Sequence, residues 1–148
     1  MTPELPLADP SIVVDASVAL KWLLPEPGSP EALALLAGGS RLLAPALLPI
    51  EVVNVLWKRV RAKEIRAEKA AELMEWLLDA PLELRAAEDL LPAALQIAVR
   101  YDRTVYDSLY VALAVSERAV LVTCDLKLRD ALAGSPLAAF IRLPGDGL

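Results

Sequence analysis

Short runs of apolar, often β-branched residues alternate along the chain with longer segments of helical periodicity. The clearest runs are Ile12–Asp15, with the sequence IVVD, and Ala119–Thr123, with the sequence AVLVT. Runs of this length are typical of strands that are buried on both faces. Arg41–Ala44, Leu82–Leu84 and Ala139–Leu143 are weaker candidates of the same kind. The pattern therefore predicts four to five short strands.

Between these strands, apolar residues recur three and four positions apart, which is the spacing of an amphipathic helix. In the segment 50–61, for example, Ile50, Val53, Leu56 and Trp57 are expected to form one buried stripe. Proline and glycine separate several of these segments, where they favour loops and helix ends. The predicted helices span about residues 16–24, 30–37, 50–61, 67–78, 87–101, 106–117 and 126–132.

Strands that alternate with helices are typical of a parallel sheet that is covered on both faces. The sequence therefore predicts an α/β fold of three layers, in which helices flank a central, mostly parallel sheet of four to five strands. No internal repeat, low-complexity segment or linker interrupts the pattern. We therefore expect a single domain over residues 1–148, a length that suffices to bury a substantial core.

Composition narrows the chemistry that the chain can perform. The sequence contains no histidine and one cysteine, Cys124. This excludes Ser-His-Asp triads, Cys-His pairs and histidine-ligated zinc sites. A cysteine without a histidine partner is expected to be a buried structural thiol. Hydrolytic chemistry would therefore rest on carboxylates and on the divalent cations that oxygen ligands bind.

Charge and hydropathy bear on partners and location. Twenty acidic and fifteen basic residues give a net charge of −5, which argues against non-specific binding to nucleic acid but not against an enzyme whose metal ions supply positive charge. The mean hydropathy is +0.46, yet no apolar run reaches the ~18 residues of a membrane span, and no signal peptide is evident. We expect a cytoplasmic protein whose apolar excess serves a subunit interface.

Four acidic residues occupy positions that favour an active site. Asp15 and Asp125 each lie where a predicted strand ends and a helix begins, and ligands of open parallel sheets bind at the carboxyl ends of the strands. An open parallel sheet has a switch point, where the order of the strands reverses and two neighbouring strands lead to helices on opposite faces. If these two strands are neighbours at the switch point, their carboxylates lie side by side. Glu51 is expected in the first turn of its helix, just after Pro49, and Asp107 at the start of its own helix.

Each of these acids also has a structural interpretation, because Asp and Glu cap helices and interact with the helix dipole, worth about 0.3–1 kcal/mol. The apolar neighbours of Glu51 and Asp107 predict partial burial, and an unpaired buried carboxylate is costly. Clustered carboxylates also repel one another unless a divalent cation joins them. We therefore interpret the four acids as a metal site.

Three neutral side chains with hydrogen-bonding oxygens accompany the acids. Ser17 lies two residues after the first acid, Thr123 two residues before the last, and Asn54 three residues after Glu51 on the same helix face. Groups of this kind orient carboxylates and metal-bound water. Capping and strand propensity explain Ser17 and Thr123 equally well, whereas Asn54 interrupts an apolar stripe and is the more specific observation.

Four segments resemble the acidic blocks of PIN-domain ribonucleases, and especially the VapC toxins of bacterial and archaeal toxin–antitoxin pairs. In chain order they are VVDASVALKWLLPE, LLPIEVVNVLW, VYDSLYVALA and LVTCDLKL. Each block alone is weakly specific, whereas the ordered set is specific and covers nearly the whole chain. The resemblance implies a PIN-like fold.

The resemblance also implies an endoribonuclease that depends on Mg²⁺ or Mn²⁺, forms a dimer or higher oligomer, and is blocked by a cognate antitoxin protein. The family's acidic positions correspond to Asp15, Glu51, Asp107 and Asp125, and its polar companions to Ser17, Asn54 and Thr123. Where some relatives carry a further acid two residues after the last one, this chain has Lys127. The number of metal ions is therefore open.

Two other functions fit parts of the pattern. A phosphohydrolase of the haloacid-dehalogenase type also begins with a strand that ends in Asp, but it requires a second Asp where this chain has Ser17. A catalytically silent PIN-like module that binds RNA or a protein would retain the fold without cleaving RNA. Four intact acids favour catalysis over this alternative, which would show partner binding without metal-dependent cleavage.

Basic and aromatic residues supply candidates for partner binding. The only basic cluster is Lys58–Arg66, which we interpret as a solvated helix face rather than as an RNA contact. The segments Ala32–Leu36 and Ala67–Leu78 are candidates for a dimer surface or for a groove that takes an amphipathic antitoxin helix. Three tryptophans are expected in the core or in an interface: Trp22, Trp57 and Trp76.

Overall fold

A computed structural model describes residues 2–147 as an α/β fold around one five-stranded sheet, in which all the strand pairings are parallel. The strand order is β3-β2-β1-β4-β5, so the order reverses between the neighbouring strands β1 and β4. The expected fold class, the strand number and the switch point are thereby confirmed. The strands are β1 (Ile12–Val14), β2 (Leu42–Pro45), β3 (Leu82–Arg85), β4 (Val120–Val122) and β5 (Ile141–Arg142).

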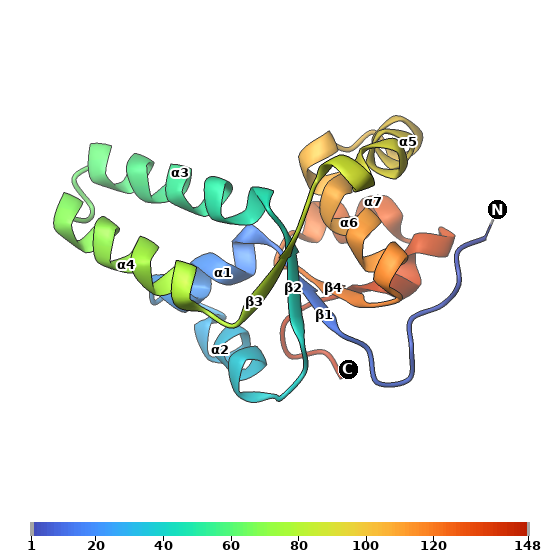
Figure 1. Cartoon of the computed structure of the whole chain (residues 1–148), viewed down its shortest axis with the longest axis horizontal. Coiled ribbons are helices and arrows are strands. Elements are labelled where there is room, and N and C mark those ends of the chain that lie inside the picture. Colours follow the sequence, from blue (N-terminus) through green and yellow to red (C-terminus); the bar gives the residue numbers. More distant parts are fainter. Residues whose placement is uncertain (1, 148) are drawn as a thin grey trace.

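Helices cover both faces of the sheet and complete the three layers (Figure 1). Helices α1 to α4 lie on one side and α5 to α7 on the other, and α3 and α4 form a hairpin that projects beyond the sheet (Figure 1). The α-helices are α1 (Ala16–Leu23), α2 (Ser29–Ala37), α3 (Leu47–Arg61), α4 (Ala67–Asp79), α5 (Leu91–Tyr101), α6 (Val105–Glu117) and α7 (Leu126–Leu132). Two 3₁₀ helices accompany them, η1 (Glu88–Leu90) and η2 (Pro136–Phe140).

The core forms around the central strands because successive residues of a strand point to opposite faces of the sheet. All residues of β1 and β4 are buried. Helix α6 packs against β1, β2 and β4 and against α5, and it is buried over the continuous stretch 108–114. A helix that is buried around its circumference is held on several sides, so the residues that α6 directs toward the strand ends have fixed positions.

Helix α3 begins at Leu47, three residues earlier than expected. Pro49 lies within its first turn, where the missing N–H group removes no helical hydrogen bond. The prediction that Pro49 precedes the helix was therefore wrong. Glu51 consequently lies in the second turn, and no acidic residue is in the first turn of α3. An interaction with the helix dipole therefore does not explain Glu51.

The buried stripe of α3 also differs from the predicted one. Leu48, Val52 and Leu56 are buried, whereas Ile50 is 67% and Trp57 51% exposed. The helical period was predicted correctly, but the face that packs inward is chosen by the neighbouring helices α1 and α4. Two large apolar side chains are thus left on the outer face of α3.

Two further boundaries differ from the predictions. The expected helix over residues 87–101 is divided into η1 and α5, with Pro92 in the first turn of α5. The expected edge strand over residues 139–143 is reduced to β5, because η2 occupies the residues before it. None of the helices between residues 2 and 147 combines the length and apolarity that crossing a membrane requires.

Candidate metal and catalytic site

Asp15 lies at the junction of β1 and α1, and its side chain is only 8% exposed. As the N-cap of α1, its Oδ1 accepts a hydrogen bond of 3.2 Å from the backbone N–H of Val18. Oδ1 also accepts from the Ser17 hydroxyl, and Oδ2 accepts from the Thr123 hydroxyl. The capping interpretation is therefore correct for Asp15, and the same carboxylate is also held by two side chains.

The two hydroxyls join the ends of β1 and β4. The backbone N–H of Cys124 donates to Ser17 Oγ at 3.0 Å, and the backbone N–H of Asp125 donates to Thr123 Oγ1 at 3.0 Å. Each hydroxyl thus donates to Asp15 and accepts from the segment that follows β4. Cys124 was expected to be buried, but the structure shows it half-buried.

Asp125 is held at the start of α7 on the neighbouring strand end. Its Oδ1 accepts hydrogen bonds from the backbone N–H groups of Lys127, at 3.0 Å, and Leu128, at 3.2 Å. Asp125 is therefore also a helix cap. Because β1 and β4 are adjacent, the charge of Asp125 acts on Asp15, as the switch-point argument predicts.

Glu51 enters the site from α3 and is held by a residue that the sequence did not single out. The hydroxyl of Tyr110, on α6, donates a hydrogen bond of 2.7 Å to Glu51 Oε1. Tyr110 is 3% exposed, so its position is determined by the core. The available signal was its spacing of three residues from Asp107 on one helix face.

Asp107 lies in the first turn of α6, as expected. The Thr104 hydroxyl caps this helix by accepting a hydrogen bond of 3.0 Å from the backbone N–H of Asp107. The Asp107 side chain is half-buried, and Arg103 is the cation that acts on it. Asp107 acts electrostatically on Glu51, and Asp125 acts on Asp107, so the four acids form one chain of interacting charges.

Asn54 does not join this network. Its side chain is exposed on α3, and it makes no hydrogen bond with any of the residues that the structure describes. Its spacing from Glu51 places it on the same helix face, farther along the helix. Of the three predicted polar companions, the structure brings Ser17 and Thr123 to the acids and leaves Asn54 at the surface.

Burial and mutual repulsion disfavour the ionised forms of the acids. Burial, with a contribution from Asp125, raises the pKa of Asp15 from its ordinary value of 3.8 to about 6. The pKa values of Glu51 and Asp107 are also raised, chiefly by burial and further by a neighbouring carboxylate. Burial and the same carboxylates hold the pKa of Tyr110 far above its ordinary range, so its hydroxyl remains a donor.

The donor chemistry fits a hard divalent cation. Carboxylate oxygens are the ligands that such ions prefer, and an ion beside these groups would favour their charged forms and relieve their repulsion. Between residues 2 and 147, no three histidine, cysteine or acidic side chains are arranged around a single point as a complete ligand set. The fit therefore rests on the chemistry and electrostatics of the acids.

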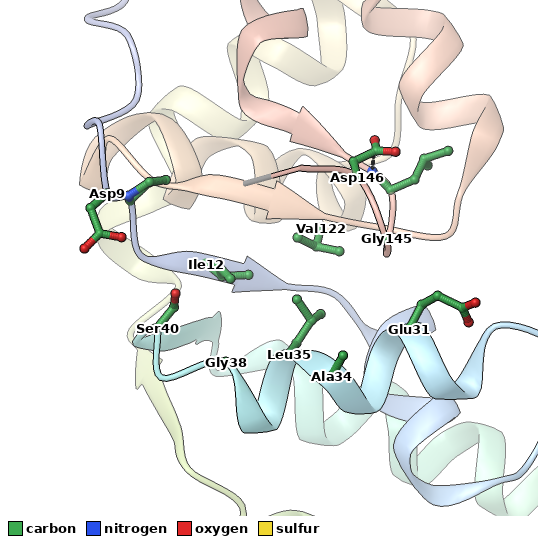
Figure 2. A pocket seen from close by; sticks show the side chains of 12 residues that line it. Asp9, Ile12, Glu31, Ala34, Leu35, Gly38, Ser40, Val122, Gly145 and Asp146 are labelled. Carbon is green, nitrogen blue, oxygen red and sulfur yellow. Dashed lines mark hydrogen bonds between the residues drawn. The ribbon is translucent and has the colours of Figure 1, made fainter.

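A separate cavity of about 450 Å³ lies between α2 and the segments that precede β1 and follow β5 (Figure 2). Ile12, Leu35 and Val122 contribute apolar side chains, and Asp9 and Glu31 lie toward opposite ends (Figure 2). Neither the four candidate acids nor their hydroxyl partners belong to its described lining. The cavity is therefore separate from the candidate site.

Replacing Tyr110 with Phe is expected to raise the pKa of Glu51 further, because the hydroxyl donates to the ionised carboxylate. Loss of the hydrogen bond is also expected to cost about 1 kcal/mol of stability. Titration of the Glu51 carboxyl by NMR and unfolding by urea measure the two effects. Tyr101→Phe, on α5, is the matched control. An unchanged Glu51 pKa in Tyr110→Phe would contradict the role of the hydroxyl.

Comparisons with known proteins find relatives over most of the chain. The family model described as PIN domain matches residues 12–132. The chain is 32% identical over 121 residues to Ribonuclease VapC3 of Pyrobaculum aerophilum, which covers 80% of this chain and 92% of that protein. It is 31% identical over 117 residues to Ribonuclease VapC12 of Mycobacterium tuberculosis, covering 79% of this chain and 88% of that protein.

A solved structure has the same fold. The toxin–antitoxin complex from Klebsiella pneumoniae contains a chain that superposes with a TM-score of 0.65 at 17% sequence identity. The superposition covers 93% of this chain and 100% of that chain. The residues matched by the family model, 12–132, include all four candidate acids.

Proposed function

The chain belongs to the PIN domain family, and from this premise we propose that it is a metal-dependent endoribonuclease, the VapC-type toxin of a toxin–antitoxin pair. One observation carries the proposal: four carboxylates at the carboxyl edge of a parallel sheet are connected in series by pairwise electrostatic interactions, in a chain without histidine. Two named relatives, both ribonucleases, support the reaction class.

The four acids are the residues that would hold Mg²⁺ or Mn²⁺: Asp15, Glu51, Asp107 and Asp125. When bound, the ion would supply Lewis acidity to activate water and to neutralise charge on the phosphodiester. Ser17 and Thr123 fix the orientation of Asp15, and Tyr110 fixes that of Glu51. We expect products with 5′-phosphate and 3′-hydroxyl ends.

A cognate antitoxin is the proposed protein partner. An apolar groove of about 260 Å³ lies between α3 and α4, and Leu56, Trp57 and Met74 contribute to it. The groove is open to the surface of the α3–α4 hairpin, and its lining is mostly apolar. Grooves of this kind receive the apolar face of an amphipathic helix. The groove uses part of the expected segment Ala67–Leu78, whereas Ala32 and Leu35 of the other candidate segment are buried in the core. The structural relative found in a toxin–antitoxin complex supports this partner.

Homodimerisation is the second proposed association. Leu91, Leu95 and Val99 are exposed on α5, and their spacing of four residues places them along one helix face. An apolar stripe of this length on a surface helix favours association with another protein surface. A second copy of the chain would cover it.

RNA cleavage with and without metal tests the proposed reaction. Purified protein is incubated with structured RNAs, including transfer RNAs, in Mg²⁺, in Mn²⁺ or in excess EDTA. Glu51→Gln retains an acceptor for Tyr110 but removes the charge, and we expect it to lose at least about 100-fold in cleavage rate. Glu117→Gln, which removes a charge that pairs with Arg85 outside the site, is the matched control and should cleave normally.

Cleavage that persists in EDTA or in Glu51→Gln would overturn the metal-dependent mechanism. Absence of cleavage together with retained binding of RNA or of an antitoxin would identify the silent PIN-like module instead. Products with 2′,3′-cyclic phosphate ends would contradict hydrolysis by an activated water.

A further inference from the structure

The outer face of α3 continues from the candidate site toward the far end of the α3–α4 hairpin. Glu51, Asn54, Lys58 and Arg61 follow one another at intervals of three, four and three residues, so they lie along one side of the helix. Asn54, Lys58 and Arg61 are exposed, and Glu51 is half-buried at the site. Ten residues of helix place Glu51 and Arg61 about 15 Å apart along the axis.

The structure divides the basic cluster Lys58–Arg66 into paired and unpaired cations. Arg59 pairs with Glu64 at 2.8 Å and with Glu26 at 4.0 Å, and Arg66 pairs with Glu68 at 3.8 Å. Within residues 2–147, Lys58, Arg61 and Lys63 form no ion pair, and Lys63 lies beyond the end of α3. The unpaired cations of α3 are therefore the two on the face that leads from Glu51, while Arg59 points elsewhere.

Trp57 lies beside these cations and is 51% exposed. The guanidinium of Arg61 lies over its indole ring, 4.9 Å from the ring centroid. This cation–π contact holds the large aromatic side chain on the outer face of α3. An exposed indole next to two unpaired cations is a combination that binds single-stranded nucleic acid, since the ring stacks on a base and the cations bind phosphates.

We propose that Asn54, Trp57, Lys58 and Arg61, here called the α3 track, bind the single-stranded segment of RNA that adjoins the cleaved phosphodiester. Lys58 and Arg61 contact phosphates, Trp57 stacks on a base, and Asn54 offers hydrogen bonds to the strand. At a stacked rise of about 3.4 Å per nucleotide, 15 Å accommodates several nucleotides. The inference rests on the proposed ribonuclease function. It states that the RNA strand next to the cleaved bond runs along α3, from Glu51 toward Arg61.

The assignment follows from charge complementarity and from continuity with the site. The protein is acidic overall, with a net charge of −5, so a polyanion requires a local path of positive charge. The α3 track supplies such a path beginning at Glu51, on the same helix. The interpretation of Lys58–Arg66 as a uniform solvated face fits Arg59 and Arg66, which are ion-paired, but it does not explain the unpaired charges of Lys58 and Arg61.

Binding of a single-stranded RNA of about 12 nucleotides, labelled with fluorescein, tests the track without relying on activity. The full-length protein is kept in EDTA, and fluorescence anisotropy gives the Kd at several salt concentrations. We expect the double variant Lys58→Gln/Arg61→Gln to raise the Kd about tenfold and to flatten the salt dependence by about 0.7 per lost phosphate contact. Arg59→Gln removes one positive charge from the same helix, at a side chain that is already paired with Glu64, and its Kd should remain within about twofold of wild type.

Cleavage kinetics and fluorescence give two further readouts. With Mg²⁺, the double variant should raise KM for RNA while kcat is retained, because the track binds RNA and does not touch the reacting atoms. Bound RNA should quench tryptophan emission in wild type, and Trp57→Phe should remove most of that quenching. Trp22 is buried and is not expected to contribute. Trp76 is 44% exposed on α4, where it packs against Trp22, so quenching that remains in Trp57→Phe is assigned to Trp76.

Different failures overturn different claims. If the double variant and Arg59→Gln have equal Kd values and salt slopes while wild type cleaves RNA, the track is wrong and the proposed function stands. If wild type neither binds nor cleaves RNA, the proposed function itself fails. If the track variants change the oligomeric state or antitoxin binding but leave RNA affinity unchanged, the face is a protein interface, and the RNA assignment is overturned.

Discussion

Replacing Asp15 with Asn should abolish metal-dependent RNA cleavage and, in the metal-free protein, should raise the stability relative to wild type as the pH increases. The two effects have one cause. Asp15 is a buried carboxylate next to Asp125, and its pKa is raised to about 6, so the native fold is destabilised when this group ionises. The same negative charge, placed at the junction of β1 and α1, is what the site would use to hold a cation. Asn retains the side-chain shape and removes the charge, but it replaces one of the two acceptor oxygens with an NH2 group, a loss that is the same at every pH.

The sign of the stability effect follows from the direction of the pKa shift. A native pKa of about 6, compared with an ordinary value of 3.8, means that the folded protein binds this proton more tightly than the unfolded chain does. The resulting stabilisation is fully present below about pH 3.8 and is lost as the pH rises through 6. Two pKa units correspond to about 3 kcal/mol. The stability of Asp15→Asn relative to wild type should therefore increase by up to about 3 kcal/mol between those limits.

Urea unfolding in EDTA at a series of pH values measures this difference, and RNA cleavage in Mg²⁺ or Mn²⁺ measures the loss of activity. We expect the rate to fall by at least about 1,000-fold. Asp89→Asn, at an exposed position in η1, is the matched control for stability and activity. A stability difference that does not grow with pH would show that Asp15 is not destabilised by its charge.

A divalent metal should stabilise the wild-type protein, and this stabilisation should be larger near neutral pH than in acid. Four interacting carboxylates, three of which have raised pKa values, repel one another in the folded protein. A cation bound to them favours the folded state by mass action, by about 2.7 kcal/mol when its concentration is one hundred times Kd. The expected rise in stability should be visible in the melting temperature.

Stabilisation by the metal should increase with pH, whereas the contribution of Asp15 to the stability of the metal-free protein decreases with pH. Below the pKa of Asp15, about 6, a proton competes with the metal for the carboxylate, so the stabilisation should shrink as the pH falls toward about 5. Thermal unfolding with Mn²⁺ or Mg²⁺, compared with Na⁺ at equal ionic strength, measures it. If Asp15→Asn were stabilised by metal as much as wild type, the ion would bind at another place.

Local sequence patterns identified the elements that carry the site. The runs Ile12–Asp15 and Ala119–Thr123 contain enough β-branched, apolar residues to predict buried strands, and the rules for parallel sheets then placed β1 beside β4. Asp15 and Asp125 could be predicted as neighbours because each follows its strand directly. That inference needed only the order of the elements and a preference that holds for most folds of this class.

The helices show where a local pattern is insufficient. The periodicity of α3 predicted a helix, but Pro49 was interpreted as a boundary although it fits the first turn equally well. The spacing of apolar residues was compatible with two inward faces, and the predicted one included Ile50 and Trp57, which are exposed. The amphipathic period is a property of the segment, whereas the buried face depends on the helices against which α3 packs.

The sequence was sufficient to predict the fold class, the order of strands and helices, and four acids as candidate ligands of a cation. Which polar groups reach those acids depends on the tertiary structure. It joined Tyr110 to Glu51, 59 residues apart in the chain, placed the Thr123 hydroxyl on Asp15, 108 residues away, and left Asn54 at the surface. Strands and helices follow from interactions between residues close in the chain, whereas a hydrogen bond between distant side chains depends on how whole elements pack.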